Sequence, residues 1–196
     1  MITELFMGLL WTLLLIILLT VPILILGKKK VIKLNAKQKR WWVIFHVLFV
    51  MIYFTGVLAI VCLSIFAMNT TDRALINAAH FFMYIFDFYL IVPGALGSLI
   101  TGVWLAIGTW GLITYYWIIV KWIGNLTTIL FGSTFIGYWI HVSFQALFHK
   151  GIDPAKNIDF LANQRNILLG IFIILGILVF LTAISYLKPW GKRFVT

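Results

Sequence analysis

Residues 5–40 read LFMGLLWTLLLIILLTVPILILGKKKVIKLNAKQKR, an apolar run followed directly by a basic segment. The apolar run, residues 5–27, has the length with which one α-helix crosses a bilayer, about 20 residues. Basic residues gather on the cytoplasmic side of a transmembrane helix, so the stretch predicts one span followed by a cytoplasmic loop. Seven of the 15 Lys and Arg residues of the chain lie in this loop: Lys28, Lys29, Lys30, Lys33, Lys37, Lys39 and Arg40.

The composition extends this prediction to the whole chain. Of 196 residues, 63% are hydrophobic and 10% are charged, whereas a soluble domain carries about 25% charged residues. A water-soluble fold of this size could not bury so much apolar surface, so we expect an all-α membrane protein. The net charge of +10 is concentrated beside apolar runs. It therefore indicates anionic lipid headgroups as the partner of residues 28–40, and not nucleic acid.

Five apolar runs follow one another along the chain, at residues 5–27, 41–68, 74–107, 112–148 and 166–187. The third and fourth exceed the length of one span and are separated by Gly108-Thr109-Trp110-Gly111, residues that favour a turn. No further polar loop divides them, so we expect one bundle of five transmembrane helices over residues 1–196.

The flanking charges set the expected orientation of this bundle. With five spans, one side receives the loop 28–40 and the tail with Lys188, Lys192 and Arg193, and it has no acidic residue. The other side receives a mixture of signs: Arg73, Lys150, Lys156 and Arg165 with Glu4, Asp72, Asp153 and Asp159. The positive-inside rule then predicts an N-terminus outside and a C-terminus in the cytoplasm, in an integral plasma-membrane protein.

Ionisable residues within the spans are the candidate functional residues, because each costs roughly 2.5–3.5 kcal/mol to insert. Five stand out: His46, His80, Asp87, Lys121 and His141. Tyr84 and Asp87 follow His80 by four and seven residues and form a polar stripe on one helix face. The single cysteine, Cys62, allows no disulfide within the chain.

The expected depths of these residues form two polar levels. His80 and His141 fall near the outer boundary, His46 and Lys121 near the inner one, and Asp87 about midway. Histidines on facing helices of a bundle are the arrangement that ligates haem iron. We therefore expect a b-type haem with His46, His80 and His141 as metal-ligand candidates. Lys121 would pair with a carboxylate, and Asp87 and Tyr84 would move protons.

Short motifs between Lys39 and Thr128 add a family resemblance. The chain reads KRWWVIFH at residues 39–46, Pro-Gly at 93–94, TGVW at 101–104 and YWIIVK at 116–121. This order resembles the HemJ and CopD-like small integral membrane proteins of bacteria. HemJ-type members bind haem and oxidise protoporphyrinogen, using a His in an early core helix and a Lys in a later one. The resemblance implies these roles for His46 and Lys121, and a bacterial inner membrane.

Other interpretations of the same residues stay open. An intramembrane histidine is commonly hydrogen-bonded to a neighbour, and Lys121 can extend its ammonium group to the interface. Asp87 beside Pro93-Gly94 is also compatible with a small transporter or channel component that uses Asp87 and Lys121. A third alternative is a non-catalytic membrane subunit of a larger complex or an oligomer. For the leading hypothesis, a membrane oxidoreductase, the partner would be lipid-soluble, a quinone or a porphyrin precursor.

Overall fold

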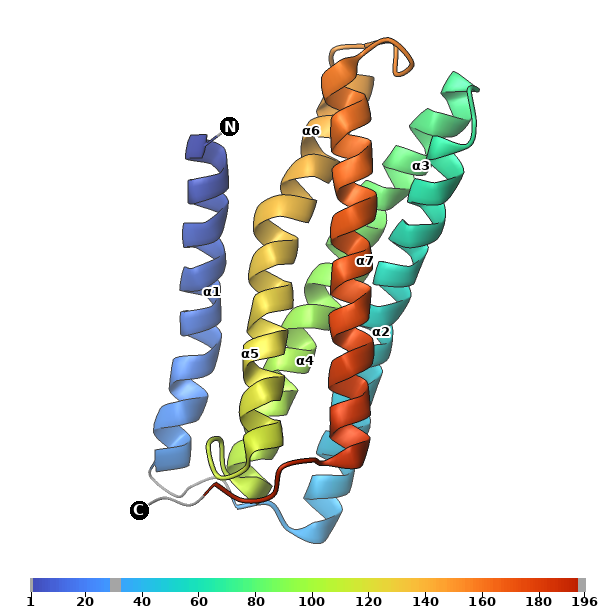
Figure 1. Cartoon of the computed structure of the whole chain (residues 1–196). Helices are drawn as coiled ribbons and strands as arrows, with labels where there is room; N and C mark the ends of the chain where they lie inside the picture. The colour runs from blue at the N-terminus through green and yellow to red at the C-terminus, as the bar shows by residue number, and fades with distance from the viewer. Residues whose placement is uncertain (1, 29–32, 194–196) are drawn as a thin grey trace.

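The computed structural model describes residues 2–28 and 33–193, which are almost entirely helical (Figure 1). Residues 29–32 of the predicted basic loop lie outside the described residues. In this part of the chain, five segments are long and apolar enough to cross a membrane, which confirms the expected five-helix architecture. They are Thr3–Gly27, Ala36–Met68, Arg73–Trp110, Tyr116–Phe148 and Ile158–Leu187.

Three of the five segments are continuous α-helices, and two contain π-helical turns. The continuous ones are α1 (Ile2–Lys28), α2 (Ala36–Met68) and α7 (Ile158–Leu187). The third segment runs α3 (Arg73–Phe86), η1 (Asp87–Ile91), α4 (Val92–Leu105) and η2 (Ala106–Trp110). The fourth runs α5 (Tyr116–Phe131), η3 (Gly132–Ile136) and α6 (Gly137–Phe148).

The π-helical turn η1 ends at Ile91, two residues before Pro93. Proline lacks an N–H and its ring crowds the preceding turn of a helix. The wider turn accommodates this, and the Val92 N–H donates to the Asp87 carbonyl. Single π-helical turns of this kind are frequent at functional sites.

Several helix ends differ from the expected ones because local capping, and not hydropathy, decides them. The second helix begins at Ala36, five residues before its apolar run, since Asn35 and Gln38 form a reciprocal capping box. The last helix begins at Ile158, where the Asn157 side chain accepts from the Phe160 N–H at 2.8 Å. The expected turn at 108–111 is shifted: η2 continues the helix to Trp110, and Gly111, at φ 80°, ends it.

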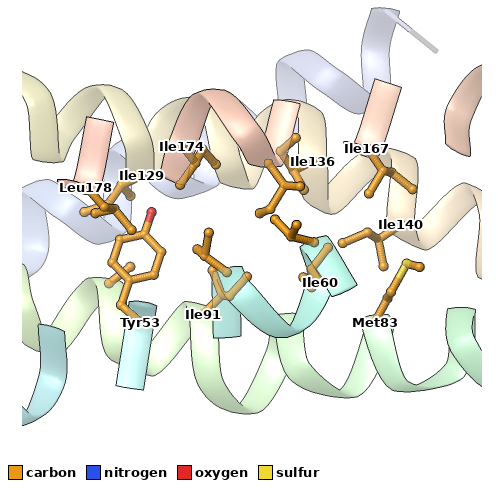
Figure 2. Close-up of a cluster of buried hydrophobic side chains, with 14 of the residues drawn as sticks. Tyr53, Ile60, Met83, Ile91, Ile129, Ile136, Ile140, Ile167, Ile174 and Leu178 are labelled. Atoms are coloured by element: carbon orange, nitrogen blue, oxygen red, sulfur yellow. The ribbon is translucent and has the colours of Figure 1, made fainter. Parts of the chain in front are cut away.

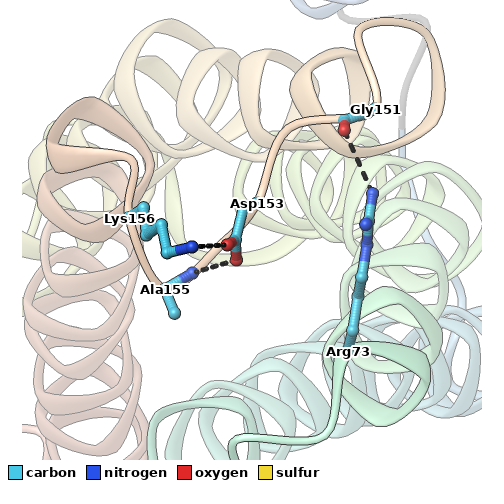
Figure 3. Close-up of polar contacts among 5 residues, drawn as sticks. All are labelled: Arg73, Gly151, Asp153, Ala155 and Lys156. Carbon is cyan, nitrogen blue, oxygen red and sulfur yellow. Dashed lines mark hydrogen bonds and ion pairs between the residues drawn. The ribbon is translucent and has the colours of Figure 1, made fainter.

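The start of α1 and the segment 188–193 lie at opposite ends of the bundle (Figure 1). We call the end with residues 33–40, the turn 111–115 and the tail 188–193 the basic end. At the opposite end, Arg73 Nη2 donates to the Gly151 carbonyl at 3.0 Å and ties the α2–α3 connection to the α6–α7 loop (Figure 3). In the same loop, Lys156 and Asp153 form an exposed ion pair at 3.4 Å, a type of contact that contributes little.

The core lies between α2, the third segment, the fourth segment and α7. Its side chains are mostly branched and aliphatic, with Tyr53 and Met83 among them (Figure 2). The first helix is peripheral: 6% of its apolar window is buried, against 56% for Arg73–Trp110. A hydrogen bond of 3.0 Å between Thr12 and Ser133 joins α1 to η3. The candidate site is therefore to be sought among the other four segments.

Candidate functional site

The antiparallel contact between α2 and α4 positions His46. Small residues on α4 let the two backbones approach closely, as is common between helices in membranes. A Cβ on Gly94 would lie 2.5 Å from the Tyr53 backbone nitrogen, and one on Gly102 would lie 3.2 Å from Cε1 of His46. This register leaves Thr101 opposite the His46 ring.

A contact with Thr101 orients the His46 ring. The His46 Nδ1 and the Thr101 Oγ1 lie 2.9 Å apart. The Thr101 hydroxyl donates to the Gly97 carbonyl at 2.6 Å, so its oxygen can accept from an Nδ1–H of His46. In that neutral tautomer, Nε2 carries the lone pair. Histidines that bind metals almost always have such a partner on their other nitrogen.

The His46 ring lines a cavity of about 740 Å³ toward the basic end of the bundle. This volume falls within the range of small-molecule and cofactor sites, about 300–1,000 Å³. Lys121 and Asn125 of α5 and Lys188 after α7 line the same cavity. The structure thus brings together His46 and Lys121, the two residues that the sequence places at one level.

Aromatic and aliphatic side chains form most of the cavity wall. Trp110, Trp117 and Trp122 contribute to it, and Trp110 packs edge-on against Trp117 with ring centroids 5.5 Å apart. The Lys121 Nζ lies 5.9 Å from the centroid of the Trp117 ring, a distance at which a cation–π attraction operates. The cavity therefore combines flat apolar surfaces with ammonium groups, which suits a flat amphiphile bearing an anionic group.

His80 lies elsewhere, buried on α3 toward the opposite end of the bundle. Its side chain is 1% exposed, and its ring lies 4.9 Å from that of Phe160. Neither ring nitrogen has a hydrogen-bond partner among the described residues. The same holds for the Ser143 hydroxyl and the Gln164 amide nitrogen, both buried.

Helices α3, α6 and α7 bring these polar groups to one level. Ile76, Leu147 and Phe160 form one buried cluster. His80 lies four residues after Ile76, Ser143 four before Leu147, and Gln164 four after Phe160. Each is therefore one helical turn nearer the middle of the bundle than its cluster residue. Together His80, Ser143 and Gln164 form a closed polar layer that does not line the His46 cavity.

His141 and Tyr84 form a third group, on the facing surfaces of α3 and α6. Their rings lie 6.4 Å apart, and Tyr84 also stacks on Phe144 with centroids 4.5 Å apart. His141 is exposed on the bundle surface, whereas His80 is buried. Within residues 2–28 and 33–193, no three His, Cys, Asp or Glu side chains gather as a metal site.

Asp87 begins the π-helical turn η1, between the two levels. A Cβ on Gly137, where η3 passes into α6, would lie 3.7 Å from its Oδ2. The Asp87 carboxyl group, at the start of η1, therefore faces the point in the fourth segment where the π-helical turn η3 passes into α6. It does not line the cavity that His46 and Lys121 share.

Sequence reasoning missed two parts of this site. Thr101 stands out in the sequence only as a small residue, although its spacing from Gly94 and Gly97 places a hydroxyl on the α2-facing side of α4. The abundance of Trp and Phe suited a porphyrin pocket, but the sequence did not single out Trp110, Trp117 and Trp122, because Trp is common at membrane interfaces. Comparison with protein-family models, curated proteins and solved structures finds no match to this chain.

Proposed function

We propose that the protein binds a b-type haem in the cavity near the basic end and exchanges electrons with a lipid-soluble partner, a quinone or a porphyrin precursor. The observation that carries this proposal is the placement of His46. Its Nδ1 lies 2.9 Å from the Thr101 hydroxyl oxygen, and the residue lines a cavity of about 740 Å³. A neutral imidazole held in this way is a suitable axial ligand for haem iron.

The remaining lining of the cavity fits the same group. The tryptophan rings offer flat apolar surfaces for a macrocycle, and Lys121 offers a cation for a propionate. A bound haem would supply one-electron chemistry, with a potential that depends on the axial ligand and the polarity around it. The chain itself would hold the ring, exclude water from it and neutralise its carboxylates.

The expected topology places this cavity on the cytoplasmic side of a bacterial inner membrane. Ten of the 15 Lys and Arg residues fall on the side of the loop 28–40 and the tail, and no Asp or Glu does. A ligand that enters from the membrane or from the cytoplasmic interface would meet this basic end first. The resemblance of residues 39–128 to HemJ and CopD-like proteins supports the same location and cofactor.

The test is the visible absorption spectrum of protein purified in mild detergent after expression with added haem. A Soret band is expected in the oxidised state, and sharp α and β bands are expected after reduction with dithionite. His46→Ala should lose or shift these bands. His141→Ala is the matched control, because His141 is exposed and lies outside the cavity. A featureless wild-type spectrum, or an unchanged His46→Ala spectrum, would refute the assignment.

Asp87 favours a second candidate function, a small transporter or channel component. A carboxyl group at the start of a π-helical turn, facing the junction of η3 and α6, resembles the broken-helix sites of transporters. This alternative predicts no chromophore and a substrate or ion flux in liposomes that Asp87→Asn abolishes. Flux that is equal in empty liposomes and in liposomes with the protein would eliminate it.

A further inference from the structure

Two lysines contact one tryptophan where the cavity meets the basic end. The Nζ of Lys39, in the first turn of α2, lies 4.7 Å from the centroid of a Trp110 ring. The Nζ of Lys188, directly after α7, lies 5.7 Å from the centroid of a ring of the same side chain. Trp110 and Lys188 both line the cavity. Lys39 lines a neighbouring surface pocket that shares Val43 with the cavity, so the two cations meet at Trp110, on the cavity wall.

The chain after α7 is folded so that Lys188 stays at this rim. Lys188 caps the helix in the left-handed region, at φ 45°, and its N–H donates to the Ile184 carbonyl. The Arg193 N–H donates to the Thr114 carbonyl at 2.9 Å, and Lys192 pairs with Tyr115 in an isolated β-bridge. The tail is thus fastened to the turn that follows Trp110.

No carboxylate side chain of the described chain neutralises this rim. The five Asp and Glu residues belong to elements away from this rim: Glu4 to the first turn of α1, Asp72 to the cap of α3, Asp87 to the start of η1, Asp153 to the α6–α7 loop and Asp159 to the first turn of α7. Lys121 and Lys188 line the cavity, and Lys39 contacts Trp110 of its wall. Like charges near one another repel most strongly where water is partly excluded. An anionic ligand would remove this repulsion.

One face of α2 connects the rim with the proposed axial ligand. Lys39, Val43 and His46 are spaced four and three residues apart and share that face. Val43 and His46 line the cavity. The seven residues from Lys39 to His46 correspond to about 10 Å along the helix. The cations and the imidazole are therefore separated along the axis of α2. One ligand could place its anionic edge at the cations and its apolar ring system beside the imidazole.

We propose that Lys39 and Lys188, held against Trp110, bind paired carboxylates on one edge of the cavity ligand. The site would then select a flat apolar molecule with two acidic groups and orient its acidic edge toward the basic end. This inference rests on the proposed function for the ligand's identity, but it concerns carboxylate recognition and not iron ligation. Neutral quinones would not satisfy this subsite.

The experiment uses a metal-free porphyrin, which His46 cannot ligate, so the result is independent of the haem assignment. Binding of the free diacid and of its dimethyl ester is measured by quenching of tryptophan fluorescence, in zwitterionic nanodiscs. The wild type should bind the diacid more tightly. Lys39→Gln/Lys188→Gln should weaken diacid binding roughly tenfold or more, since a charge-assisted hydrogen bond typically contributes at least that factor. Ester binding should stay unchanged.

Two control variants separate the subsite from general charge and folding. Lys33→Gln/Lys37→Gln removes the same charge from exposed positions at the same end and should retain the diacid preference. Lys39→Arg/Lys188→Arg should retain most of it. If the glutamine pair does not fold, Lys188→Gln alone and the wild-type diacid–diester difference carry the test.

Two results would overturn the proposal. One is equal wild-type affinity for diacid and diester, or no binding of either. The other is unchanged diacid affinity in the glutamine pair. In nanodiscs that contain phosphatidylglycerol, the amount of anionic lipid bound by the glutamine pair is compared with that bound by the wild type. If the pair binds less lipid while its diacid affinity is unchanged, the lysines bind headgroups and not the cavity ligand. A haem spectrum that fails while the porphyrin results hold would refute the His46 assignment alone.

Discussion

Replacing Gly94 by alanine tests the α2–α4 contact on which the whole site depends. The added Cβ would lie 2.5 Å from the backbone nitrogen, 2.8 Å from Cα and 2.9 Å from Cβ of Tyr53. None of these atoms belongs to the flexible end of a side chain, so the strain cannot be relieved by a rotamer change. The helices must separate.

The size of the effect follows from two opposing contributions. Overpacking in a close-packed interior typically costs about 1–3 kcal/mol. Alanine in place of glycine within a helix contributes about 1 kcal/mol in the other direction. Gly176 on α7 is the matched control, since a Cβ there has nothing within 4 Å, so Gly176→Ala receives only the favourable contribution. We expect Gly94→Ala to be less stable than Gly176→Ala by about 1–3 kcal/mol.

The assay compares both variants with the wild type by denaturant unfolding in mixed micelles. Separation of α2 from α4 should also lengthen the His46–Thr101 hydrogen bond, so Gly94→Ala should lose affinity for the cavity ligand as well. A Gly94→Ala variant that is as stable as Gly176→Ala would show that α2 and α4 are not in this close register. The position assigned to Thr101 opposite His46 would then be wrong.

Three further predictions concern the site, the closed polar layer and the orientation. Thr101→Val removes the hydroxyl that contacts the His46 Nδ1 and should weaken the binding of the cavity ligand about 10–100-fold. Thr101→Ser keeps the hydroxyl and should keep the affinity. Titration with haem measures the affinity of both variants. Ser143→Ala should change the unfolding free energy by less than about 1 kcal/mol, because the buried hydroxyl has no partner to lose among the described residues. In a cysteine-free background, an impermeant thiol reagent should label Lys156→Cys in intact cells and Lys37→Cys only after permeabilisation; the opposite pattern would invert the topology.

Hydropathy was sufficient to predict the five spans because a bilayer imposes a minimum apolar length. It did not predict where the helices begin: α2 starts at Ala36, before the polar residues 37–40, because of the Asn35 capping box. It also did not predict the π-helical turns. These depend on one extra residue in a turn, which neither composition nor periodicity reveals.

The candidate site was predictable in depth but not in side-chain direction. Counting residues from the span ends placed His46 with Lys121, and both line the cavity. The same counting placed His80 with His141, but one is buried against Phe160 and the other is exposed. Direction depends on helix rotation, which close contacts such as Gly94–Tyr53 determine and which a single sequence does not specify.

The contrast between His46 and His80 indicates which end of the bundle can bind a ligand without rearrangement. Both are neutral-imidazole candidates in an apolar setting, but the His80 ring is 1% exposed and enclosed by three helices. A macrocycle at His80 would require α3, α6 and α7 to separate and would expose the isoleucine-rich core to lipid or water. At His46 the space already exists, the ring contacts Thr101 at 2.9 Å, and Lys121 and Lys188 line the same cavity. A ligand of macrocycle size therefore fits beside His46 without the rearrangement that His80 would require.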